Sequence, residues 1–169
     1  MSDFSTVVAG RSLELPTDYA ALLTAYGPGA FRQYYAEVAV FSLGNQHPRY
    51  DIASSTRETA DILNGLYDNL RDDWLPYPFW PEPGGLLQWG SAEVETLFWL
   101  TEGVADEWPV VVLRDTEQIY ERVDMTATEV ILGLIAGPSP TRLKSALTCP
   151  GVTFSMSPAR VGDLYEDEA

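Results

Sequence analysis

The chain has 169 residues, of which 46% are hydrophobic, and its 25 acidic against 10 basic residues give a net charge of −15. This length is typical of a single domain, and the hydrophobic content indicates a globular protein and argues against intrinsic disorder. The charge argues against direct binding to nucleic acid, because the phosphate backbone is also negative. The excess of acid has two interpretations, a well-solvated surface or a surface that attracts a basic partner.

The patterning of the chain divides it into three parts. Residues 1–12 are predicted to be a mobile N-terminus, residues 13–160 a single domain, and residues 161–169 an acidic tail. The N-terminus has no basic segment followed by an apolar run, and no stretch reaches ~18 consecutive apolar residues. We therefore expect a cytoplasmic protein without a membrane span. Cys149 is the only cysteine, so an intrachain disulfide is excluded.

The first predicted helix starts at Pro16, where the missing N–H of proline costs little, and ends at Gly27, which can adopt a left-handed cap. Its apolar positions recur at helical spacing, namely Tyr19, Leu22, Leu23 and Tyr26. Residues 36–43 follow as a predicted strand.

The second predicted helix begins near Ser55, because Ser55 and Glu58 have the spacing of a capping box. An apolar stripe indicates that it continues to about Asp73. The stripe consists of Leu63, Leu66, Tyr67, Leu70 and Trp74. Residues 75–85 contain four prolines and are predicted to be a connector without helix.

Four strands are predicted next, one that ends at Gly90 and others over residues 94–100, 108–114 and 118–123. Their short connections favour hairpins. The last predicted helix covers residues 126–137 and opens with a second capping box, Thr126 with Glu129. The order of elements predicts an α+β domain, in which helices pack against one face of an antiparallel sheet of about four to six strands.

Sequence motifs for catalysis are absent. His47, the only histidine, lies in a predicted loop, and neither a nucleophile elbow nor a nucleotide-binding glycine motif occurs. Residues 91–129 contain ten acidic and two basic residues. Paired carboxylates of this kind hydrolyse glycosides or bind a metal in some proteins, but their place at predicted turns favours an acidic rim. We assign no cofactor, no metal and no catalytic residue.

The tryptophans differ in their predicted environments. Trp89 and Trp99 lie inside strands and are predicted to be core residues. Trp80 lies in the proline-rich connector and Trp108 at the start of a strand, where an aromatic side chain can contact a partner. The connector can equally fold its own aromatic side chains back onto the sheet. Together with the acidic residues between the strands, these two tryptophans form the predicted partner-binding set, which is Trp80, Glu102, Asp106, Glu107 and Trp108.

Four segments together resemble the SUKH superfamily, also called the Smi/Knr-like family. They cover roughly residues 13–137 and read LPTDYAALLTAYGPGAF, GGLLQWG, LFWL with WPVVV, and DMTATEVILGLIAG. The connector 45–83 and the segment after 138 depart from the family pattern. The resemblance implies an α+β fold without shared catalytic residues. Its bacterial members are implied to be immunity proteins that bind and neutralise polymorphic toxins, and a fungal member regulates cell-wall synthesis.

From this resemblance we expect a non-enzymatic immunity protein that binds a toxin domain with a basic surface, for instance a nuclease domain. The acidic surface is consistent with such a partner. Two alternatives stay open, a regulatory or scaffold module with a cellular partner, and a carboxylate-dependent hydrolase.

Overall fold

A computed structural model describes residues 6–8, 11–34, 36–144, 147 and 151–156. Within them lie three α-helices, α1 (Thr17–Tyr26), α2 (Ile52–Tyr67) and α3 (Ala127–Ala136). The strands are β1 (Thr6–Val8), β2 (Arg11–Leu13), β3 (Gly29–Gln33), β4 (Ala36–Val40), β5 (Leu86–Ala92), β6 (Glu95–Leu100), β7 (Val110–Arg114), β8 (Ile119–Val123) and β9 (Thr153–Met156).

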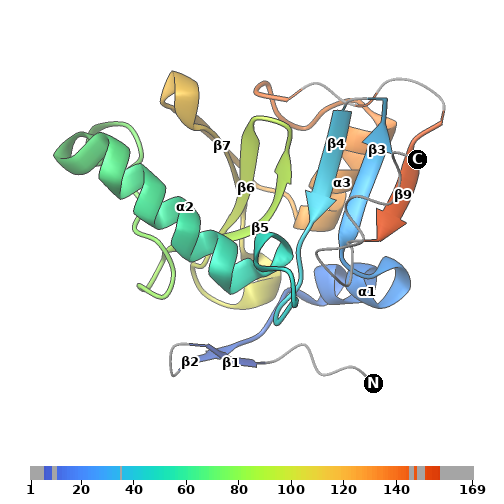
Figure 1. The fold of residues 1–169 in the computed structure, drawn as a ribbon, viewed down its shortest axis with the longest axis horizontal. Helices are drawn as coiled ribbons and strands as arrows, with labels where there is room; N and C mark the ends of the chain where they lie inside the picture. Colours follow the sequence, from blue (N-terminus) through green and yellow to red (C-terminus); the bar gives the residue numbers. More distant parts are fainter. Residues whose placement is uncertain (1–5, 9–10, 35, 145–146, 148–150, 157–169) are drawn as a thin grey trace.

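Strands β3 to β9 form one antiparallel sheet in the order β8-β7-β6-β5-β4-β3-β9, while β1 and β2 pair separately as a hairpin (Figure 1). The predicted α+β fold with an antiparallel sheet is confirmed, and its seven strands slightly exceed the predicted number. The hairpin occupies a stretch for which the sequence predicted no element. The acidic tail 161–169 and Cys149 lie outside the described residues.

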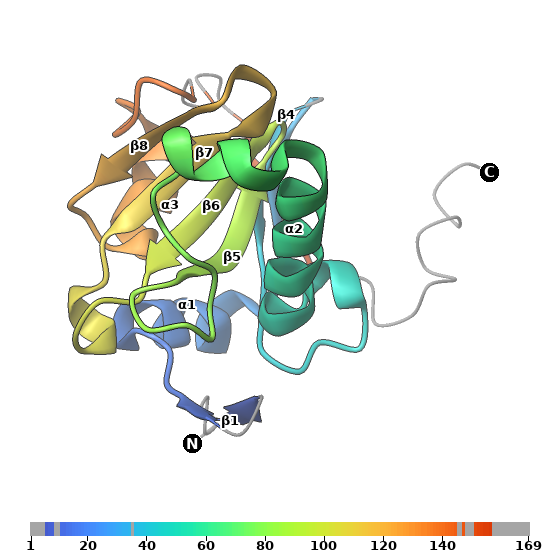
Figure 2. The same cartoon turned by 90° about the vertical axis from the view of Figure 1, so that its left-hand side faces the viewer.

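The helices cover both faces of the sheet, which corrects the expectation that they share one. Side chains of α1 and α3 pack with Trp89 and Trp99 in one cluster of buried residues. Leu63 of α2 packs with Phe98 and Val111 in another, on the opposite face. Because side chains alternate along a strand, β6 supplies both clusters. Figure 2 shows α2 on one side of the sheet and α3 on the other.

Helix α2 starts three residues earlier than its predicted capping box. Asp51 caps it, since its Oδ2 accepts a hydrogen bond from the Ser54 N–H at 2.9 Å. Ser55 is buried and donates to the Pro48 carbonyl instead. The predicted stripe is also only partly correct. Leu63 is buried, but Leu66 and Leu70 are each 67% exposed.

Helix α2 also ends earlier than predicted, at Tyr67, and a 3-10 helix, η2 (Asp68–Asp73), occupies the rest of the predicted span. The boundaries predicted for α1 and α3 are confirmed. Gly27 follows α1 with a φ of 74°, and the capping box of α3 forms in both directions between Thr126 and Glu129. Strands β3 and β9 were missed. Gly29 of β3 lies against β9, where a Cβ would stand 2.2 Å from the Ser155 carbonyl oxygen, so this position requires glycine.

Candidate functional site

The predicted core tryptophans lie in the sheet under α1. Both Trp89 and Trp99 are fully buried, which confirms their prediction as core residues. Trp89 occupies a β-bulge, since β5 shifts register against β6 between Gln88 and Gly90. The Tyr19 ring meets Trp99 edge-on with centroids 4.8 Å apart. The indole N–H of Trp89 has no hydrogen-bond partner in the described part of the chain.

The Tyr19 hydroxyl joins α1 to β5 and to the residue that follows β4. It lies 2.8 Å from the Phe41 carbonyl oxygen and 2.7 Å from the Trp89 carbonyl oxygen, and it accepts from the Phe41 N–H at 3.1 Å. Burial raises the pKa of Tyr19 well above its usual value. This arrangement fixes α1 against the end of the sheet at which the candidate site lies.

Trp80 is held by a compact loop before β5. The backbone N–H of Trp80 donates to the Leu86 carbonyl at 3.0 Å, and the backbone N–H of Leu86 donates to the Pro78 carbonyl at 2.8 Å. Gly85 closes the loop, because a Cβ there would lie 2.5 Å from the Trp80 nitrogen. The Thr101 N–H and hydroxyl both donate to the Gly85 carbonyl. The proline-rich connector is therefore an ordered support for Trp80.

Trp108 is held by a second loop, which contains the short 3-10 helix η3 (Ala105–Glu107). The Trp108 ring lies 6.1 Å from the ring of the core residue Trp99, and its indole N–H donates to the Gly103 carbonyl at 3.4 Å. One side of Trp108 thus packs on the core while the residue stays partly exposed.

Asp106 has a structural role that the sequence did not suggest. Its Oδ1 accepts from the Thr17 N–H at 2.6 Å and its Oδ2 accepts from the Thr17 hydroxyl at 2.9 Å. Pro16, at the N-cap position of α1, makes no side-chain cap, so Asp106 supplies the capping carboxylate from 89 residues away. Asp18 of α1 in turn accepts from the Thr128 N–H of α3 at 3.2 Å.

The two loops enclose an open groove of about 460 Å³, which we name the tryptophan groove. Trp80 and Trp108 line it, together with Pro81 and Pro83. Glu14 and Glu82 are its charged residues, and it is completed by Leu13, Thr101, Gly103, Val104 and Ala105. The lining thus combines aromatic surface with negative charge.

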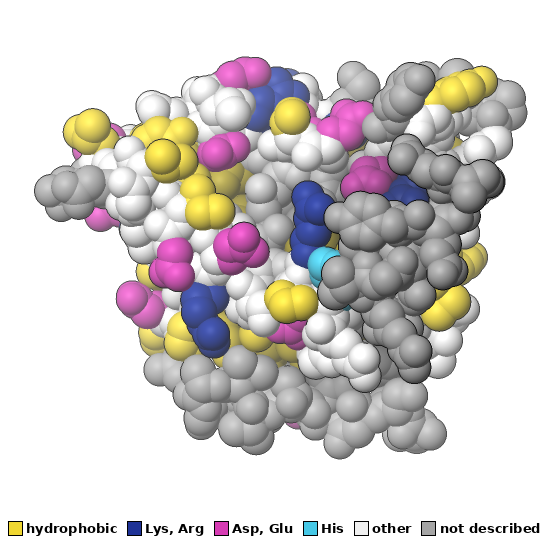
Figure 3. All heavy atoms as spheres, in the orientation of Figure 1, with side chains coloured by type: hydrophobic (Ala, Val, Ile, Leu, Met, Phe, Trp, Pro, Cys, Tyr) yellow, Lys and Arg dark blue, Asp and Glu magenta, His cyan; other side chains and the backbone are white. Residues whose placement is uncertain are grey.

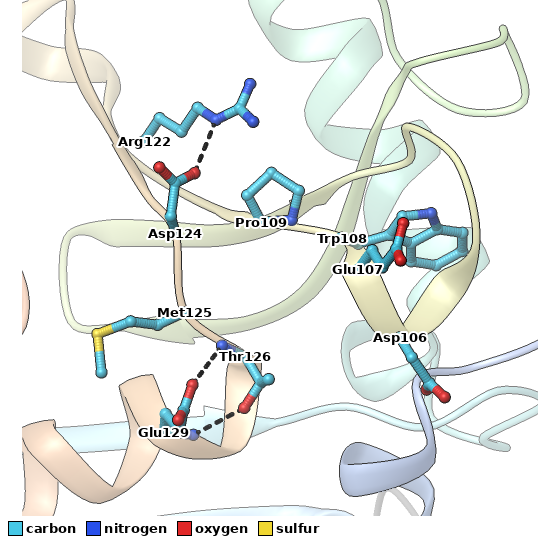
Figure 4. A pocket seen from close by; sticks show the side chains of 9 residues that line it. All are labelled: Asp106, Glu107, Trp108, Pro109, Arg122, Asp124, Met125, Thr126 and Glu129. Atoms are coloured by element: carbon cyan, nitrogen blue, oxygen red, sulfur yellow. Dashed lines mark hydrogen bonds and ion pairs between the residues drawn. The ribbon is translucent and has the colours of Figure 1, made fainter.

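A smaller hollow of about 230 Å³ lies on the other side of Trp108, and we name it the acidic hollow (Figure 4). Three of its four carboxylates have partners: Asp106 points to α1, Glu129 caps α3, and Asp124 pairs with Arg122 at 3.1 Å. Within the described residues no hydrogen bond or ion pair engages the fourth, Glu107. Glu107 is therefore the carboxylate of this hollow that is available to a partner.

The structure brings the predicted partner-binding residues into one region. Trp80 and Trp108 share the tryptophan groove, while Asp106, Glu107 and Trp108 share the acidic hollow. Glu102 stands beside both, since its chain neighbours line the groove and its Oε2 lies 3.5 Å from Arg122 of the hollow.

Sequence reasoning missed several residues of this region, above all Glu14, Glu82 and Arg122. Glu82 lies two residues after Trp80, so its position in the sequence could have indicated that it lies near Trp80 in the site. Glu14 reaches the groove only because the chain after the N-terminal hairpin passes below the two loops. No local pattern in the sequence signals that approach.

Comparisons with known proteins do not assign a family. No family model, no curated protein and no solved structure matches this chain. The resemblance to the SUKH superfamily therefore stays a prediction, and it rests on the four segments quoted above.

Other surfaces offer less to a partner. An apolar stripe of Ile62, Leu66 and Leu70 is exposed along α2 and the 3-10 helix that follows it, where Figure 3 shows hydrophobic side chains interspersed with acidic ones. In the described part of the chain no group of three or more His, Cys, Asp or Glu side chains is arranged to hold a metal. None of the helices there is long and apolar enough to cross a membrane.

Proposed function

We propose that this chain is a non-enzymatic protein-binding module that neutralises a toxin domain with a basic surface by binding it. The single observation that carries the proposal is the tryptophan groove. Two tryptophans from separate loops line it together, and all of its charged lining residues in the described chain are acidic. Partly exposed tryptophan is enriched among residues that dominate binding energy.

The support around the groove favours binding without rearrangement. Both loops are closed by backbone hydrogen bonds, and Trp108 packs on a fully buried tryptophan. A surface that is fixed before binding loses less conformational entropy on association. The chemistry of the region is contact area and negative charge, which serve recognition of a basic protein.

The direct test is a pull-down of the protein encoded by the adjacent gene, followed by calorimetric titration of its isolated toxin domain. We expect binding, which Trp108→Ala weakens by roughly tenfold or more, as for an interface hot spot. Glu107→Lys should also weaken it, whereas Glu58→Lys should not. Glu58 is an exposed glutamate on α2, so this control changes the net charge equally and leaves the groove untouched.

Two results would count against the proposal. A neighbouring protein that does not bind removes the expected partner, and equal loss of affinity with Glu107→Lys and Glu58→Lys shows that only net charge matters. The regulatory alternative predicts a cellular partner in place of a toxin domain, and the same variants apply to it.

A further inference from the structure

The tryptophan groove has features that select one kind of side chain, given that the proposed function is protein binding. Its aromatic lining is contributed by Trp80 and Trp108, and Glu14 and Glu82 are both exposed carboxylates on it. No described residue forms a hydrogen bond or ion pair with either carboxylate. As far as the described residues show, the groove therefore combines tryptophan side chains with carboxylates that have no partner.

We infer that this groove receives an arginine side chain from the protein partner. A guanidinium group is planar, stacks on an indole ring and donates hydrogen bonds to carboxylates from its edge at the same time. The groove offers both kinds of contact, aromatic surface from Trp80 and Trp108 and carboxylates from Glu14 and Glu82. Its volume of about 460 Å³ lies within the ~300–1,000 Å³ typical of ligand pockets, so it accommodates a long side chain with its flanking backbone.

Other side chains fit this chemistry less well. An apolar side chain would remove water from Glu14 and Glu82 without pairing them, which costs free energy. A lysine ammonium group is compact and strongly hydrated, so it gains less from the indole faces than a guanidinium group does. An acidic side chain would be repelled by the carboxylates.

The charges around the groove are complementary to a cation at more than one point. Glu102 flanks the rim, where its Cγ lies 3.9 Å from the position of a Cβ on Gly84. Glu107 stands on the other side of Trp108 without a described partner. Arg122 pairs with Glu102 and Asp124 at 3.5 and 3.1 Å, so it offsets part of the negative charge of the hollow, and it forms no described ion pair with Glu14 or Glu82.

The experiment uses the full chain and three short probe peptides, acetyl-GRGRG-amide, acetyl-GKGKG-amide and the citrulline analogue. Titrations are followed by the indole ¹H–¹⁵N signals of the five tryptophans. We expect the arginine peptide to shift Trp80 and Trp108 but not Trp89 and Trp99, which are buried. It should bind roughly tenfold more tightly than the lysine peptide, and the uncharged citrulline peptide should not bind.

The variants Glu82→Lys and Glu58→Lys separate the groove from the overall charge. Glu82 is exposed and makes no described side-chain contact that supports the fold, so we expect Glu82→Lys to lower arginine-peptide affinity by roughly tenfold and Glu58→Lys to leave it nearly unchanged. Equal affinities for the arginine and lysine peptides, or shifts confined to other tryptophans, would overturn the inference.

The arginine inference and the proposed function can be refuted independently of each other. A chain that binds the toxin domain through Trp108 but shows no arginine preference refutes only the arginine inference. A chain that prefers the arginine peptide but does not bind the toxin domain supports the groove assignment and refutes the toxin partner.

Discussion

Among single residues, Tyr19 joins several separate parts of the fold. Its hydroxyl meets backbone groups of Phe41 and Trp89, which lie on adjacent segments of the central sheet, and its ring packs against Trp99. The sequence predicted the buried face of α1 but not this hydroxyl contact. Tyr19 and Phe41 are 22 residues apart and Tyr19 and Trp89 are 70 apart, so no local pattern indicates it.

Replacing Tyr19 by Phe should destabilise the protein. The ring contacts remain, but the single hydroxyl proton that is shared between the buried carbonyl oxygens of Phe41 and Trp89 is lost, and the loss of this buried hydrogen bond costs about 1–3 kcal/mol. Urea denaturation followed by tryptophan fluorescence measures the change. A free energy of unfolding equal to that of the wild type would show that the hydroxyl contributes nothing.

The same residue predicts a dependence on alkaline pH. An unfolded tyrosine ionises near pH ~10, whereas burial raises the pKa of Tyr19 in the folded chain well above that value. The stabilisation is present below pH ~10 and decreases as the pH rises beyond it, because only the unfolded state loses the proton. Denaturation at a series of pH values should show a smaller alkaline decrease for Tyr19→Phe than for the wild type.

Asp106 and Glu107 are adjacent acids with different roles. Asp106→Ala should lower the free energy of unfolding by about 0.5–2 kcal/mol, because α1 loses its capping carboxylate. Glu107→Ala removes no described contact and should leave thermal stability unchanged. Differential scanning fluorimetry of the two variants measures this contrast. Equal melting temperatures for the two variants would contradict the capping role of Asp106. In that case both variants could be used to test binding without an effect on stability.

At the scale of elements, the chain shows why some boundaries were predictable and others were not. The capping box of α3 lies within four consecutive residues, so the spacing of Thr126 and Glu129 was sufficient. The same spacing at Ser55 and Glu58 misled, because Asp51 lies upstream and caps α2 first. Strand β9 is a four-residue edge strand whose pairing with β3 no local pattern indicates.

Gly85 connects the stability of one loop to the geometry of the groove. In Gly85→Ala the new Cβ would lie 2.5 Å from backbone atoms of Phe79 and Trp80, so the loop must move. We expect lower stability and weaker partner binding, because Trp80 is displaced. Measurement of both properties by fluorimetry and calorimetry checks the prediction.

A matched glycine variant provides the control for that change. Gly65 of α2 is exposed, and a Cβ added there would meet no atom within 4 Å outside the backbone of its own helix. Gly65→Ala should stabilise the protein by about 0.5–1 kcal/mol, because alanine favours the helix. Its binding should equal that of the wild type. Destabilisation by both variants would show that glycine replacement, and not the crowding at Gly85, causes the effect.

At the scale of the whole molecule, the net charge of −15 acts together with the position of the groove. The association rate with a basic partner should fall as ionic strength rises from ~0.01 to ~0.15 M, since the screening length shortens from ~30 to ~8 Å. The dissociation rate should change little, because it depends on the contacts of Trp80 and Trp108. Stopped-flow fluorescence measures both rates. An association rate independent of salt would show that the charge does not guide the encounter.

The pairing of β9 with β3 also determines when the fold can be completed. Phe31 of β3 stands opposite Phe154 of β9, and their rings lie 4.8 Å apart. During synthesis on the ribosome, β3 emerges early and must wait with one edge unpaired until residues 153–156 leave the exit tunnel. An open strand edge is a template for pairing with other chains. Chains that are truncated before β9 should therefore depend most on chaperones and aggregate most readily.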